Sequence, residues 1–275
     1  MTNINKFEGG DILYHFTKKN YALEDILLTK KLKLSTLKQY NDPYEYKALP
    51  SAFNWAGKLN EEDIKDKFNY LINEYNKYVL HNVKIKCFSV NNHTNQELLK
   101  PTSCPLDYCP FPLDKPYKNI RLWHQYAENH YGVCFVISKK KLLEINYPIF
   151  SVYDYKAQEV FYQKNIVLNF PSIDLNINIH NNIEVETFIK NKIDEILHYK
   201  SMDFIDEQEF RIWIHDTDDK IENLEINNTI VGIILGDRFP EIYIPLIIEF
   251  CKNNNNIPCY KAFFDNSQLI FLEYC

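Results

Sequence analysis

Apolar and polar residues alternate along the chain with two different periods, which predicts a mixture of strands and helices. Runs rich in β-branched and aromatic residues predict strands at about residues 12–17, 31–35, 83–90, 133–137, 207–214, 230–235, 257–264 and 269–274. Apolar residues at helical spacing predict helices at about residues 61–80, 117–130, 185–197 and 240–251. Because the strands do not alternate regularly with helices, the pattern favours an α+β fold.

The strand predicted at residues 207–214 has two chemically different faces. Successive side chains of a strand alternate, so Glu207, Glu209 and Arg211 share one face, while Phe210 lies with apolar residues on the other. Neutral β-formers are more common on a surface strand, so this group of charges indicates a polar cleft. The alternative interpretation is an ion pair between Arg211 and a carboxylate on a solvated face of the sheet.

Composition and charge limit the classes of protein. The chain has 275 residues, of which 45% are hydrophobic and 25% charged, as in an ordinary globular protein. The net charge of −6 argues against broad binding to nucleic acid, although it leaves room for a local basic groove. Residues 1–10 lack the features of a signal peptide, and no apolar run reaches the ~18 residues of a membrane span. We therefore expect a cytoplasmic protein that does not bind a membrane.

The seven cysteines are odd in number and scattered, so we expect reduced, buried thiols. Cys104 and Cys109 could bind zinc by their spacing, but no second Cys or Cys/His pair lies near them, and no metal site is predicted. Both belong to the long segment 91–117, which we interpret as a lid or specificity loop. Residues 41–45 have the pattern of a helix start, without any chemistry.

Motif content disfavours several enzyme classes. Only six glycines are present, with neither a Walker A motif nor a dinucleotide fingerprint, which disfavours kinases, P-loop ATPases and Rossmann dehydrogenases. A Ser/His/carboxylate hydrolase could use His15 and Ser89, but no Gly-x-Ser-x-Gly elbow surrounds Ser89. The paired glutamates fit a different reaction, because a fixed carboxylate stabilises the positive charge that develops when a glycosidic bond breaks. A second carboxylate can orient or deprotonate the nucleophile.

Five motifs stand in order along the chain: Leu13-Tyr14-His15-Phe16-Thr17, Asn41-Asp42-Pro43-Tyr44-Glu45, Cys87-Phe88-Ser89, Trp123-x-x-Tyr126-Ala127-x-x-His130-x-Gly132, and Glu207-x-Glu209-Phe210-Arg211. Together they resemble a bacterial family catalogued as a domain of unknown function, over about residues 12–236. That family in turn is similar to ADP-ribosyltransferases. The resemblance implies a single ADP-ribosyltransferase-like domain over residues 1–275, with a split β-sheet and flanking helices.

The resemblance also implies a role for individual residues, with NAD as the donor substrate. Glu209 would be the catalytic glutamate that hydrogen-bonds the nicotinamide ribose, and Glu207 the accessory acid that positions or activates the acceptor. His15 would hydrogen-bond the adenosine ribose, and Ser89 would support the nicotinamide-ribose pocket. Ser89 departs from the usual serine motif, since Val90 and Asn91 follow it where Thr-Ser is expected.

Two further residues are candidates for NAD binding. Arg211 shares the charged face, and Tyr14 either stacks on a ring of NAD or packs in the core. Trp123, Tyr126 and His130 share a predicted helix face, which we interpret as packing, with His130 as a weaker site candidate.

The implied function is mono-ADP-ribosylation of a protein or nucleic-acid acceptor by a toxin or phage-defence effector, which a regulatory or antitoxin partner could restrain. One alternative is an NAD glycohydrolase, which uses water as the acceptor. The other is a non-catalytic module that binds a nucleotide or a protein. Glu207 and Glu209 argue against the latter, because two carboxylates repel an anionic dinucleotide.

Overall fold

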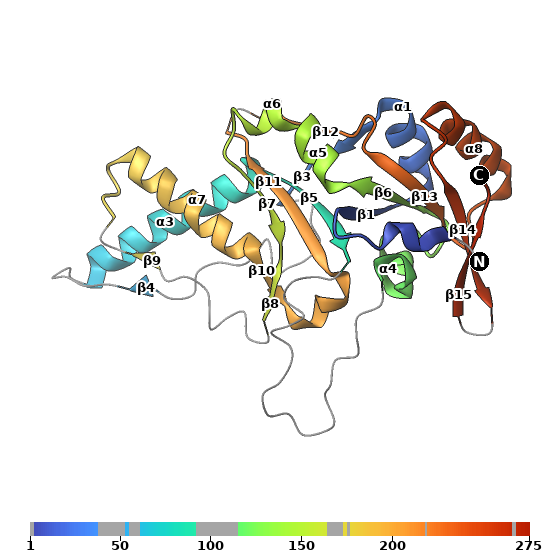
Figure 1. The fold of residues 1–275 in the computed structure, drawn as a ribbon. Helices are drawn as coiled ribbons and strands as arrows, with labels where there is room; N and C mark the ends of the chain where they lie inside the picture. The colour runs from blue at the N-terminus through green and yellow to red at the C-terminus, as the bar shows by residue number, and fades with distance from the viewer. Residues whose placement is uncertain are drawn as a thin grey trace, which may run out of the picture.

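A mixed sheet of nine strands dominates the described part of the chain (Figure 1). The computed structural model describes residues 3–37, 53–54, 61–91, 115–163, 173–174, 177–217, 219–265 and 268–275. The strands of this sheet are β1 (Ile12–Thr17), β3 (Ser35–Thr36), β5 (Val83–Val90), β6 (Val133–Ser138), β7 (Tyr155–Glu159), β11 (Glu209–His215), β13 (Ile230–Leu235), β14 (Cys259–Asp265) and β15 (Gln268–Glu273). Their order is β15-β14-β13-β6-β1-β5-β11-β7, with β3 beside β5, and only the β13–β14 pair is parallel.

The sheet parts between β1 and β5. These strands pair only at Leu13 with Val90 and Tyr14 with Ser89. Nearer the start of β5, its partner on that side is β3, through Ser35 with Ile85. The second half of β1 and the first part of β5 therefore separate, and residues of both strands and of β3 border the opening.

Three short strand pairs lie outside this sheet: β2 (Lys31–Lys33) with β12 (Asn223–Glu225), β8 (Phe161–Gln163) with β10 (Tyr199–Ser201), and β4 (Phe53–Asn54) with β9 (Ile173–Asp174). The α-helices are α1 (Leu27–Thr29), α3 (Glu61–His81), α4 (Ile120–Gln125), α5 (Lys139–Ile145), α6 (Tyr147–Phe150), α7 (Asn182–His198) and α8 (Ile244–Asn253). Shorter helical turns are η1 (Asn3–Phe7), the π-helical η2 (Tyr21–Ile26), η5 (Pro116–Lys118), η7 (Met202–Glu207) and η8 (Glu241–Tyr243).

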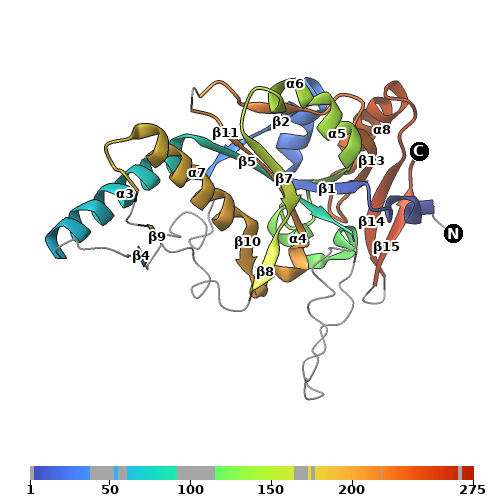
Figure 2. The ribbon, with the colours of Figure 1, turned by 60° about the vertical axis from the view of Figure 1, so that its left-hand side comes forward.

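Apolar residues cover both faces of the sheet, but in different ways. One face carries a continuous core, where Leu13, Phe88 and Phe210 pack with residues of α1, α5, α6 and α8. The other face carries two separate cores. One lies under α3 and α7 and includes Trp213, and the other lies under α4 and η1 and includes Tyr14. Figures 1 and 2 show α3 and α7 side by side at one end of the molecule, and α8, β14, β15 and both termini at the other.

The structure confirms the mixed α+β prediction and the strands at residues 12–17, 83–90 and 230–235. The helix predicted at 117–130 is wrong beyond Gln125, because Glu128, Asn129 and His130 have positive φ angles of 52°, 54° and 71° and form a turn.

Several predictions concern residues that the structure does not describe. The helix start at 41–45, most of the loop 91–117, and the pair Cys104 and Cys109 lie outside the described residues. Within the described residues, no helix is long and apolar enough to cross a membrane.

Candidate functional site

Glu207 and Glu209 do not belong to one strand. Glu207 ends the 3-10 helix η7, Gln208 adopts the left-handed conformation (φ 46°, ψ 54°), and β11 begins at Glu209. The argument from strand alternation is therefore wrong for Glu207, because the chain is not extended at Glu207 or Gln208 and alternation holds only along an extended chain.

The two carboxylates nevertheless meet in a buried ion cluster, which we define as Lys200, Glu207, Glu209 and Arg211. Lys200 Nζ lies 2.8 Å from Glu207 Oε2 and 3.0 Å from Glu209 Oε2. Arg211 donates from Nε to Glu209 Oε1 at 2.8 Å and from Nη2 to Glu209 Oε2 at 2.9 Å. Strand β10 supplies Lys200, so the cluster joins the edge of the β8–β10 pair to the main sheet.

The cluster is closed to solvent, which corrects the prediction of an open polar cleft lined by Glu207, Glu209 and Arg211. Arg211 is 0% exposed and both glutamates are 4% exposed. The prediction of an ion pair between Arg211 and a carboxylate is confirmed, although the pair is buried instead of solvated. The ion cluster lies on the face of the sheet that carries the two separate apolar cores, one with Trp213 and the other with Tyr14.

Burial and the neighbouring charges act differently on the two glutamates. Burial raises the pKa of Glu207 above its usual value, although Lys200 partly opposes this. Burial also acts to raise the pKa of Glu209, but Arg211 and Lys200 outweigh it and hold that pKa well below its usual range. Glu209 is thus a fixed carboxylate ion, whereas the protonation of Glu207 responds more readily to its surroundings.

Tyr126 extends the cluster towards the surface. Its hydroxyl donates to Glu207 Oε1 at 2.9 Å, and the residue is 40% exposed. Burial of the hydroxyl, followed by the charge of Glu207, raises the pKa of Tyr126, so the hydroxyl keeps its proton and remains a donor. Arg121 Nη2 lies 3.5 Å from the same carboxylate oxygen, and Arg121 is held in place by an ion pair with Asp206.

A pocket of about 470 Å³ opens where β1 and β5 part, and we call it the parted-strand pocket. Its wall includes His15 from β1, Lys86 from β5, Ser35 from β3 and Tyr126. Segment 21–33 closes another side through η2 and β2. Tyr126 therefore connects this pocket to Glu207 of the ion cluster.

The pocket is rich in positive charge. In the described part of the chain, Lys18, Lys33 and Lys86 line it, against one lining carboxylate, Asp25. Burial lowers the pKa of Lys86 to about 8, so its amino group is only partly protonated in weakly alkaline solution. Burial, and then the charge of Lys86, lowers the pKa of His15 well below its usual value, so its imidazole is neutral at physiological pH. An anionic ligand is the natural occupant of such a pocket.

The structure separates His15 from Glu209, whereas the resemblance implies that both residues bind one NAD molecule. Tyr14 pairs with Ser89, and Ser89 pairs with Glu209 in turn, so these three residues lie on one face of the sheet. His15 is the next residue along β1 and points to the opposite face, where its ring contacts Phe88. Even so, His15 lines the parted-strand pocket, so it borders the same opening as Tyr126.

Tyr14 and Ser89 are both buried. The ring of Tyr14 is 0% exposed in the core, and its hydroxyl donates to the carbonyl of Phe7 and accepts from Asn91 Nδ2 at 2.8 Å. It therefore packs in the core and has no ring surface free for stacking on a ligand. Ser89 lies opposite Glu209 and is also buried.

Arg211 and His130 also lie apart from the parted-strand pocket. Arg211 is fully engaged by Glu209 and by the carbonyl of Leu197, at 3.0 Å, which leaves little capacity for a cofactor. His130 stacks on Trp123 at 6.4 Å between ring centroids, away from the ion cluster.

Three residues of the site were missed by the sequence analysis. Tyr126 was interpreted as packing, although it binds Glu207. Lys200 gives no periodic signal, because its strand has three residues. Lys86 did have a signal, since Lys84 and Lys86 share a face of β5 with the buried Phe88. Two lysines in line with a core phenylalanine indicate an interrupted core.

Comparisons with known proteins point to the same region. Residues 122–212 match the model of the family DUF2971, described as a protein of unknown function. No curated protein and no solved structure matches the chain. The matched stretch begins in α4, ends in β11 and contains Tyr126 and all of the ion cluster. Within the described residues, no group of three or more His, Cys, Asp or Glu side chains could hold a metal ion.

Proposed function

We propose that the chain transfers ADP-ribose from NAD to a macromolecular acceptor. The observation that carries the proposal is the contact between Tyr126, which lines a positively charged pocket, and Glu207, which is paired with Glu209 through Lys200. A pocket for the phosphates of a dinucleotide and a fixed carboxylate pair beside it are the two parts that cleavage of an N-glycosidic bond requires.

In this proposal the phosphates of NAD bind near Lys18, Lys33 and Lys86, and a ring of NAD lies against the exposed Tyr21. As nicotinamide leaves, positive charge develops on the ribose. Glu207 is the carboxylate suited to meet that charge, because it contacts a residue of the pocket wall. Glu209 has a positioning role, since it holds Lys200, and Lys200 in turn holds Glu207. The sequence resemblance assigned these two roles in the opposite order.

Glu207→Gln tests the proposal, because it keeps the shape of the side chain and removes the negative charge. Turnover of NAD is expected to fall about 100- to 1,000-fold, the usual effect of losing one electrostatic stabiliser, with a much smaller change in the affinity for NAD. The assay measures nicotinamide release and the transfer of labelled ADP-ribose to cell lysate. Glu249→Gln, an exposed glutamate on α8, is the matched control and should retain full activity.

Two outcomes of this assay change the assignment. In the first, the wild type releases nicotinamide at the same rate with and without lysate, and no component of the lysate is labelled. This result identifies an NAD glycohydrolase. A wild-type protein that neither binds nor cleaves NAD refutes both enzymes.

The second candidate is a non-catalytic module that binds a nucleotide. It is favoured by the balance of charge in the ion cluster, where Lys200 and Arg211 compensate both carboxylates. A compensated carboxylate stabilises a developing positive charge less than an uncompensated one. Binding of NAD by the wild type, with no release of nicotinamide in the presence of lysate, would identify this module.

A further inference from the structure

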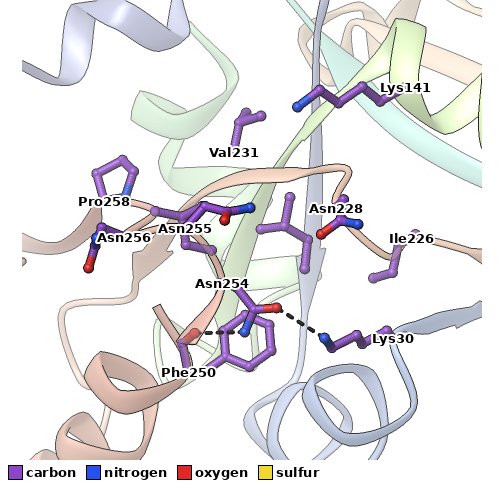
Figure 3. A pocket seen from close by; sticks show the side chains of 12 residues that line it. Lys30, Lys141, Ile226, Asn228, Val231, Phe250, Asn254, Asn255, Asn256 and Pro258 are labelled. Carbon is purple, nitrogen blue, oxygen red and sulfur yellow. Dashed lines mark hydrogen bonds between the residues drawn. The ribbon is translucent and has the colours of Figure 1, made fainter. Parts of the chain in front are cut away.

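A second pocket, of about 270 Å³, is built by residues far apart in the sequence (Figure 3). Its lining comes from the end of α1, from α5, from the start of β13 and from the chain that follows α8. Lys30 and Lys141 extend into it from opposite sides (Figure 3). The lining residues are Lys30, Lys141, Ile226, Asn228, Ile230, Val231, Phe250, Asn254, Asn255, Asn256, Ile257 and Pro258. We call it the asparagine pocket.

The lining is half polar and half apolar, and its charge is entirely positive. Among the described residues that line the pocket, none is a carboxylate, although the whole chain has a net charge of −6. The neighbouring lysines Lys31 and Lys140 lie 3.0 Å and 4.0 Å from glutamate oxygens. Lys30 and Lys141 form no ion pair within the part of the chain that the structure describes. Two ammonium groups without counter-ions at one pocket attract an anion.

The polar wall is held in place by hydrogen bonds. Lys30 Nζ donates to Asn254 Oδ1 at 3.0 Å, and Asn254 Nδ2 donates to the carbonyl of Phe250 at 2.7 Å. Figure 3 shows this chain of contacts along one edge of the pocket. Asn254 thus fixes the direction of the Lys30 ammonium, and the binding geometry exists before a ligand arrives.

The backbone around this pocket is also unusual. Lys30, Asn228, Asn255 and Asn256 all have positive φ angles, of 56°, 59°, 64° and 52°. Most side chains disfavour this conformation, asparagine less than others, and non-glycine residues that adopt it are enriched at ligand-binding sites. Three separate segments supply these four residues, so the feature is not a property of one turn.

We propose that the asparagine pocket binds a small organic phosphate of the size of a sugar phosphate. The phosphate lies between Lys30 and Lys141, the asparagine amides hydrogen-bond the hydroxyl groups, and the body of the ligand covers Phe250. The volume corresponds to roughly nine waters at ~30 Å³ each, which suits a sugar phosphate. The two pockets share no lining residue, so this site is separate from the proposed NAD pocket and does not depend on it.

Calorimetric titration of the full chain with ribose 5-phosphate, inorganic phosphate and ribose tests this proposal. Ribose 5-phosphate is expected to bind, inorganic phosphate to compete with it, and ribose to bind at least tenfold more weakly, since it lacks the anionic group. Lys141→Glu should weaken the binding of ribose 5-phosphate tenfold or more, and Lys30→Met about tenfold. The control Lys140→Glu makes the same change of charge one residue away and should leave the affinity unchanged.

Lys141 is exposed, so its substitution does not disturb the core and the test does not depend on a fragile variant. Three results overturn the proposal. The first is that the wild type does not bind ribose 5-phosphate. The second is that ribose binds as tightly as ribose 5-phosphate. The third is that neither Lys141→Glu nor Lys30→Met weakens the binding of ribose 5-phosphate.

Discussion

Glu209→Gln probes the centre of the buried ion cluster. The Glu209 carboxylate accepts two hydrogen bonds from Arg211, at 2.8 Å and 2.9 Å, and one from Lys200 at 3.0 Å. A glutamine at this position keeps one acceptor oxygen and turns an amide donor towards a cation. Arg211, which is 0% exposed, then remains in the core without a compensating negative charge.

The size of the effect follows from that imbalance. Breaking a buried ion pair by removing one partner costs about 3–5 kcal/mol, because the remaining charge stays desolvated. In a chain of this size such a loss lowers the thermal midpoint by roughly 6–20 °C. Glu207→Gln should cost much less, about 1 kcal/mol, because burial already raises the pKa of Glu207 and Lys200 keeps Glu209 as a partner.

Urea unfolding at pH 7, followed by circular dichroism, measures the two variants against the wild type. The pKa of Glu209 is lowered in the folded protein, so its stabilising contribution is complete above about pH 4.3, the unfolded value, and is lost as the pH falls. The gap between wild type and Glu209→Gln should therefore narrow below about pH 4. Equal stability of Glu209→Gln and wild type at pH 7, or a larger loss in Glu207→Gln, would refute this account of the cluster.

Two further substitutions test the parted-strand pocket. Tyr126→Phe removes the hydrogen bond to Glu207 Oε1 and should reduce NAD cleavage about tenfold while costing only about 0.5–1.5 kcal/mol of stability. Tyr131→Phe, an exposed tyrosine of the same turn, is its control, and equal activity of the two variants would exclude a role for Tyr126. Lys86→Met removes a lysine whose pKa is lowered to about 8, whereas an unfolded lysine titrates near 10.4. Between these two values the wild type should gain stability relative to Lys86→Met as the pH rises, and urea unfolding at pH 7 and pH 9.5 checks the sign.

The elements that the sequence predicted well are those with a strong periodic pattern. β1, β5 and β13 are rich in β-branched, aliphatic and aromatic residues over a length that matches a strand, and α3 and α7 carry apolar stripes over several turns. The predicted strand 207–214 was less accurate, because alternation describes only a chain that stays extended. The left-handed Gln208 breaks the strand, and no feature of its residue type indicates that conformation.

The predicted site failed where it depended on register between strands. Alternation shows that His15 and Tyr14 point in opposite directions, but it does not show which of them shares a face with Glu209. That depends on the pairing of Tyr14 with Ser89, and of Ser89 with Glu209. Such pairing is a tertiary property that one sequence does not contain. The contacts of Lys200 could not be predicted for the same reason. Lys200 reaches both glutamates because of where β10 lies in the folded chain, which one sequence does not show.

The contacts of the two carboxylates decide which of them can serve a ligand. Both oxygens of Glu209 accept from buried cations, so a ligand that replaced either partner would leave a charge unpaired in the core. Oε1 of Glu207 accepts from the hydroxyl of Tyr126, a neutral donor on a half-exposed side chain. A hydroxyl group of a ligand can donate to this oxygen beside Tyr126, because a carboxylate oxygen accepts more than one hydrogen bond, and no buried cation is then left unpaired. Glu207 is therefore the carboxylate available to chemistry in the parted-strand pocket, and Glu209 holds it in position.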